Sequence, residues 1–73
     1  HPAEQAIAEI KKHVEENSHY VGKEFAKEAR AMHLGDLPER PIYGEAKAEE
    51  AKSLIDDGIP VTPLPFTPNR KTN

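Results

Sequence analysis

Apolar residues recur at three- and four-residue spacing through the first seventeen positions. They are Ala3, Ala6, Ile7, Ile10 and Val14. This spacing places them on one face of an α-helix. Pro2 suits the first helical position, where its missing N–H would have no partner in any case. Asn17 and Ser18 are poor in a helix interior and good as caps, so the pattern predicts a helix from Pro2 to about Asn17.

A second apolar stripe follows this break. Its members are Val21, Phe25, Ala29 and Met32. They predict a helix from about His19 to His33, which Gly35 is placed to end. A glycine inside a helix lowers its stability by about 1 kcal/mol relative to alanine, so Gly22 needs an explanation. Either another backbone comes close to it, or the helix starts just after it. The short break predicts that the first two helices form an antiparallel hairpin.

Residues 35–44 (GDLPERPIYG) predict a stiff connector, because Pro38 and Pro41 push the residues before them towards extended geometry. Ile42 and Tyr43 are apolar, so we expect them to pack on another part of the protein. A third helix is predicted from about Glu45 to Asp57, followed by Gly58. Its inner face is expected to consist of Ala48, Ala51, Leu54 and Ile55.

The last segment, residues 59–73, contains four of the seven prolines. Proline excludes a helix there and favours an extended, polyproline-like chain. The segment is too apolar for an ordinary linker, so it should lie on the chain's own helices, on a neighbouring subunit or on a partner. Residues 65–70 (PFTPNR) also fit the P-x-x-P-x-basic pattern read by SH3-type grooves, although this pattern is short and common by chance.

These elements together predict an all-α fold. A helical domain of residues 1–58 would contain three short helices, namely the helical hairpin and a third helix, and residues 59–73 would form an extended proline-rich arm. The chain has 73 residues, of which seventeen are apolar and larger than alanine. So small a core leaves a thin stability margin, and we therefore expect association, either as a homodimer or in a complex with another protein.

Composition excludes several classes of function. There is no room for a nucleotide-binding α/β enzyme, and without cysteine there is no disulfide framework, thiolate metal site or thiol nucleophile. The longest apolar runs are too short to span a membrane. No signal peptide is visible, so a cytoplasmic location is expected. His1 is interpreted as a processing product or a tag remnant.

The formal net charge is −3, whereas domains that grip nucleic acid usually carry a basic surplus. Nucleic acid is therefore not expected as a partner, and a regulator that binds it through Lys23, Lys27 and Arg30 is kept as an alternative. Residues 35–59 carry seven acids and three bases. We expect three of these acids to face a basic surface on a partner: Glu45, Glu49 and Glu50.

Catalytic and metal chemistry find little support in the sequence. Nucleophilic catalysis needs a nucleophile, a base and an orienting group around a pocket. Ser18 and Ser53 are the only serines, and Ser53 has no histidine near it in the sequence. A core this small can hardly enclose a pocket, so neither enzyme activity nor a cofactor is expected. Glu16 and His19 have the Glu-x-x-His spacing of di-iron bundles. Such sites need two of these motifs, and the single motif here spans the predicted helix break, so its two side chains would not share a helix face. No metal site is therefore expected, but a dimeric metal or small-ligand carrier using Glu16, His19 and His33 remains an alternative.

The function favoured by the sequence is that of a small, non-enzymatic regulator, inhibitor or adaptor that binds another protein. Its contact surface would combine an apolar helix face with the proline-rich arm. The candidate contact residues are Tyr20, Phe25, Met32, Ile42, Tyr43, Leu64 and Phe66. Aromatic residues and methionine are enriched at interfaces and in cores alike, so the sequence leaves open which of these residues form the core.

Overall fold

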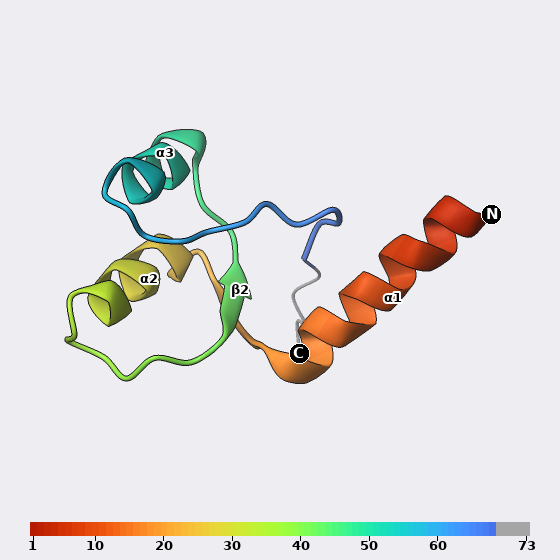
Figure 1. Cartoon of the computed structure of the whole chain (residues 1–73), viewed down its shortest axis with the longest axis horizontal. Helices are drawn as coiled ribbons and strands as arrows, with labels where there is room; N and C mark the ends of the chain where they lie inside the picture. The colour runs from red at the N-terminus through yellow and green to blue at the C-terminus, as the bar shows by residue number, and fades with distance from the viewer. Residues whose placement is uncertain (69–73) are drawn as a thin grey trace.

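The computed structural model describes residues 1–68 (Figure 1). These residues form three helices and a two-stranded sheet. The order of elements is α1 (Pro2–Asn17), β1 (His19–Gly22), α2 (Phe25–His33), β2 (Ile42–Gly44) and α3 (Ala48–Asp56). The fold is therefore mixed α/β, and the all-α prediction is wrong.

The sheet takes the place of the predicted helical hairpin. Strands β1 and β2 are parallel, with His19 opposite Ile42 and Tyr20 opposite Tyr43. Parallel strands need a crossover connection, and α2 with the connector after it supplies one. Because β1 separates α1 from α2, the first two helices do not follow one another directly as the hairpin required.

The backbone at Gly22 explains why the second helix begins later than predicted. Gly22 has φ of +58°, a left-handed conformation that cannot continue a helix. The preceding Tyr20 and Val21 are aromatic and β-branched, which favours a strand. The sequence allowed either a helix that starts after Gly22 or a second backbone close to Gly22, and the structure has both. Helix α2 starts only at Phe25, and the backbone of Gly44 lies directly against that of Gly22.

Helix α3 ends in a hydrogen-bonding pattern that leads the chain into the core. The Gly58 N–H donates to the carbonyl oxygen of Ile55, and the Ile59 N–H donates to that of Leu54, which is the Schellman pattern. The helix is shorter than predicted at its start. The Glu45 N–H donates to the Gly22 carbonyl oxygen, 2.9 Å away, so Glu45 extends the strand pairing and cannot begin the helix.

The core lies where α2, α3 and the segment after α3 meet. Leu54 is 1% exposed, Ile59 4% and Ala29 8%, and Phe25 and Val61 pack against them. The first residues of the proline-rich segment thus pack on the chain's own helices. Ile55, in contrast, is 60% exposed, so its assignment to the inner face of α3 is wrong.

Helix α1 has the bounds that the sequence predicts, but it projects away from the rest of the molecule (Figure 1). None of its sixteen residues is buried. Its apolar stripe therefore remains accessible, with Ile7 40% and Ile10 44% exposed.

Candidate functional site

An open hollow of about 500 Å³ lies beside the core, between α2, the connector and the start of the proline-rich segment. We call it the α2 groove. The residues that line it are Phe25, Ala29, Met32, His33, Glu39, Arg40, Pro41, Ile42, Ile59 and Pro60. Most of them are apolar, and the charged ones come from the connector.

Helical spacing and the Schellman turn create the apolar part of the groove. Phe25, Ala29 and Met32 share one face of α2, because they follow one another at four and three residues. The opposite wall includes Ile42, which enters β2, and Ile59, which the end of α3 leads inward. Ala29 and Ile59 are buried, whereas Met32 and Ile42 are half-buried, so apolar surface remains accessible inside the groove.

Two contacts of Arg40 tie the connector to α2. Its Nη2 donates to Glu28 Oε1 at 2.9 Å, and its backbone N–H lies 3.4 Å from Met32 Sδ as a weak hydrogen bond. His33 and Glu39 also border the groove and are exposed. The groove therefore combines an apolar interior with polar groups at its edge, the usual composition of a recognition site.

The structure brings three of the predicted contact residues together, because Phe25, Met32 and Ile42 all line the α2 groove. Tyr20 and Tyr43 form a separate pair on the sheet, with ring centroids 5.3 Å apart.

The remaining predicted contact residues lie on the proline-rich arm. Leu64 and Phe66 are half-buried, and neither lines the α2 groove. Arg70 of the P-x-x-P-x-basic pattern lies outside the described residues.

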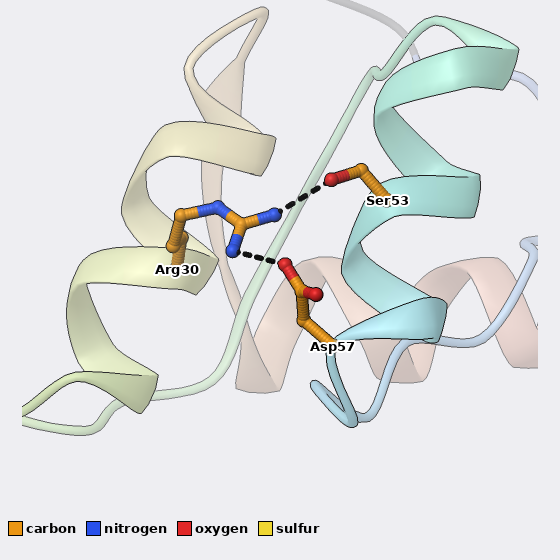
Figure 2. A network of polar contacts seen from close by, with 3 residues as sticks. All are labelled: Arg30, Ser53 and Asp57. Carbon is orange, nitrogen blue, oxygen red and sulfur yellow. Dashed lines mark hydrogen bonds and ion pairs between the residues drawn. The ribbon is translucent and has the colours of Figure 1, made fainter.

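Arg30, one of the basic residues considered for an external partner, makes its polar contacts within the chain. Arg30 donates from Nη1 to Asp57 Oδ2 at 2.6 Å and from Nη2 to Ser53 Oγ at 2.9 Å, which joins α2 to the end of α3 (Figure 2). Arg30 and Lys27 also line a second hollow together with Glu49 and Glu50. The three basic residues of the nucleic-acid alternative therefore differ in environment, because Arg30 bonds to residues at the end of α3 while Lys23 and Lys27 are exposed.

Two of the three predicted acidic contacts have partners inside the chain. Glu45 Oε2 accepts a hydrogen bond from the Tyr20 hydroxyl at 2.7 Å, and Glu50 Oε1 accepts one from the Lys47 backbone N–H at 2.9 Å. The second contact holds the first turn of α3. Glu49 is exposed, which leaves it as the most accessible of the three.

The residues of the alternative metal site are distributed over three elements. Glu16 lies on α1, His19 begins β1 and His33 ends α2. Within residues 1–68, no group of three or more histidine, cysteine, aspartate or glutamate side chains is close enough to hold a metal ion.

Sequence reasoning missed Glu39, Arg40 and Pro60 as residues of the groove, and it named His33 only for the alternative metal or small-ligand site. Their signal was present in the connector, where Glu39 and Arg40 stand between two prolines. Charged residues held in a stiff, extended segment next to an apolar pair are well placed to border a binding surface. The contribution of Pro60 depends on the turn after α3.

The elements define a small mixed α/β domain built on a β-α-β unit, with an open groove along its crossover helix. Residues 1–69 match the model of a family described as protein of unknown function (DUF1178), and the chain belongs to this family. A search of curated proteins and a search of solved structures each returned no match. No helix within residues 1–68 is long and apolar enough to cross a membrane.

Proposed function

We propose that this domain is a non-enzymatic binding module that takes an apolar segment of another protein into the α2 groove. It would act as a regulator, inhibitor or adaptor. The observation that carries the proposal is the accessible apolar surface of Phe25, Met32 and Ile42 inside a groove with a polar edge. Aromatic and methionine side chains are enriched at protein interfaces.

The framework of the groove supports this role. Arg40 holds the connector against α2 through Glu28, and the buried Ile59 fixes the opposite wall. Such a surface exists before binding, so little conformational entropy is lost when a partner binds. Met32 is the adaptable element, because its unbranched side chain can repack around different apolar groups.

The edge of the groove indicates the chemistry of the partner segment. The polar groups there are the His33 ring and the Glu39 and Arg40 side chains. An apolar side chain would fill the interior, and polar groups next to it would bond to the edge. A peptide segment provides both in its side chains and backbone.

Site-specific photocrosslinking tests the proposal. A benzophenone amino acid replaces the exposed His33 at the edge of the groove, and in a control it replaces the exposed Lys52 on α3. In cells of the source organism, we expect a discrete protein adduct from position 33 but not from position 52. The added substitution Met32→Gln, which keeps the length of the side chain, should abolish the adduct.

Two results would contradict the proposal. One is the absence of any adduct from position 33 in folded protein. The other is an adduct of the same size and yield from position 52, since this would indicate contact without the groove.

A further inference from the structure

The apolar stripe of α1 repeats with heptad spacing. Ala3, Ile7, Ile10 and Val14 follow one another at intervals of four, three and four residues, the spacing of the seam between two paired helices. The stripe is accessible along a helix that stands away from the rest of the molecule (Figure 1). In proteins, most of the stability of a helix comes from the packing of its apolar face rather than from helix propensity.

The two edges of this stripe differ in charge. By helical geometry, Glu4 and Lys11 lie along one edge, and Ala6 and His13 lie along the other. One edge therefore carries an acid near the start of the helix and a base one heptad later. This arrangement is complementary to itself when the helix direction is reversed.

We infer that α1 pairs in antiparallel orientation with α1 of a second copy of the chain. A two-fold axis passing between positions 8 and 9 places Ile7 opposite Ile10 of the second copy, and Ala3 opposite Val14. In antiparallel helix pairs, like edges face each other. Glu4 of each copy then lies within about 3 Å, measured along the axis, of the level of Lys11 in the other. Two symmetry-related ion pairs therefore flank the apolar contact.

Charge complementarity distinguishes this arrangement from a parallel pair. In parallel helices, the edge with Glu4 and Lys11 would face the edge with Ala6 and His13 of the other copy. Lys11 would then lie opposite Ala6, with no ion pair. The antiparallel pair is the one in which both charges of the edge find a partner.

The contact is small, because it uses one face of a sixteen-residue helix. We therefore expect a reversible dimer that forms at protein concentrations of about 10–500 µM rather than a permanent one. The inference is independent of the α2 groove, since the groove uses no residue of α1.

Sedimentation equilibrium on the full chain provides the first test. Ile10→Asp is suitable because Ile10 is 44% exposed and lies outside the core of the domain. The unchanged chain should show a monomer–dimer equilibrium, and the Ile10→Asp chain should remain monomeric at every concentration. An unchanged chain that is monomeric at about 500 µM would overturn the inference, whether or not another partner is later found on α1.

Charge reversal tests the orientation. Glu4→Lys alone and Lys11→Glu alone each place like charges opposite one another in the antiparallel pair, so each should weaken dimerisation about tenfold. The double variant Glu4→Lys/Lys11→Glu restores the opposite charges and should dimerise more tightly than either single variant. Lys12→Glu, which makes the same charge change on the far side of the helix, is the matched control and should leave the dimer unchanged.

The pattern of these four variants decides between the orientations. Equal weakening by Lys11→Glu and Lys12→Glu, or a double variant no tighter than the single ones, would exclude the antiparallel pair. Circular dichroism on each variant checks that α1 remains helical.

Discussion

Two glycines determine how closely the strands approach at the end of the sheet. A Cβ atom on Gly44 would lie 2.5 Å from the Gly22 carbonyl oxygen and 3.1 Å from Phe25 Cβ. The first neighbour is a backbone atom in a paired strand, so it cannot move aside without breaking the pairing. The sequence flagged Gly22 as unusual, but it gave no indication that Gly44 is its neighbour.

Gly44→Ala should therefore destabilise the domain strongly. We expect a loss of about 3 kcal/mol in the free energy of unfolding, the upper part of the range for overpacking, measured by urea denaturation followed by circular dichroism. Gly35→Ala is the control, because a Cβ there meets nothing within 4 Å and only the positive φ opposes it. It should cost about 1 kcal/mol, and a Gly44→Ala chain that loses no more than this would contradict the packing described.

Neighbouring residues on α3 have opposite environments. Leu54 is 1% exposed and Ile55 is 60% exposed, although the apolar pattern of the sequence assigned both to the inner face. Leu54→Ala should cost about 2–5 kcal/mol, whereas Ile55→Ala should change stability by less than about 0.5 kcal/mol. Thermal unfolding of the two variants checks this prediction. Equal losses of stability would show that Leu54 and Ile55 do not differ in burial as described.

At the scale of elements, helices were predictable and strands were not. The 3.6-residue period ran through sixteen residues of α1 and through most of α2 and α3, so the existence of all three helices could be predicted. Strands β1 and β2 have four and three residues, too few for a two-residue alternation to be recognised. Their pairing joins segments that are distant in sequence, with His19 opposite Ile42 and Gly22 opposite Gly44, and no local pattern specifies it.

The α2 groove was only partly predictable for the same reason. Phe25 and Met32 could be identified because they belong to the helical stripe, and Ile42 because it is apolar in a stiff connector. The opposite wall depends on where β2 pairs and on how the chain leaves α3, and both are set by contacts between distant segments. Residues such as Arg40 and Pro60 acquire their role only through these contacts.

The contact between α2 and α3 includes a polar link that can be measured. Arg30 bonds to Asp57 and Ser53, but the Arg30 and Asp57 side chains are 37% and 52% exposed, so solvent screens the ion pair. A double-mutant cycle with Arg30→Gln and Asp57→Asn should give a coupling of about 0.5–1 kcal/mol that decreases at high salt. No coupling at low salt would show that the pair adds nothing to helix packing.

At the scale of the whole molecule, the proline-rich segment contributes to the folded domain. Ile59 is buried and Val61 packs against the core, so the chain needs residues beyond α3 to complete its interior. Proline in this segment reduces the freedom of the unfolded chain, which favours such packing. Two of the seventeen larger apolar residues counted in the composition thus come to the core from this segment.

Truncation tests this dependence. A chain ending at Gly58 should lose cooperative thermal unfolding, because it lacks Ile59 and the groove wall that it forms. A chain ending at Thr62 retains Ile59 and Val61 and should still unfold cooperatively. If the shorter chain unfolds with the same midpoint as the longer one, the segment does not belong to the core.

The central claim is that the chain acts by binding another protein in the α2 groove. Nuclear magnetic resonance of the isotopically labelled chain, titrated with the protein captured by photocrosslinking at position 33, tests it most directly. We predict saturable shift changes at Ala29, Met32 and Ile42, with Lys52 unaffected. Changes confined to α1, or no changes at a stoichiometric excess of the captured protein, would contradict the claim.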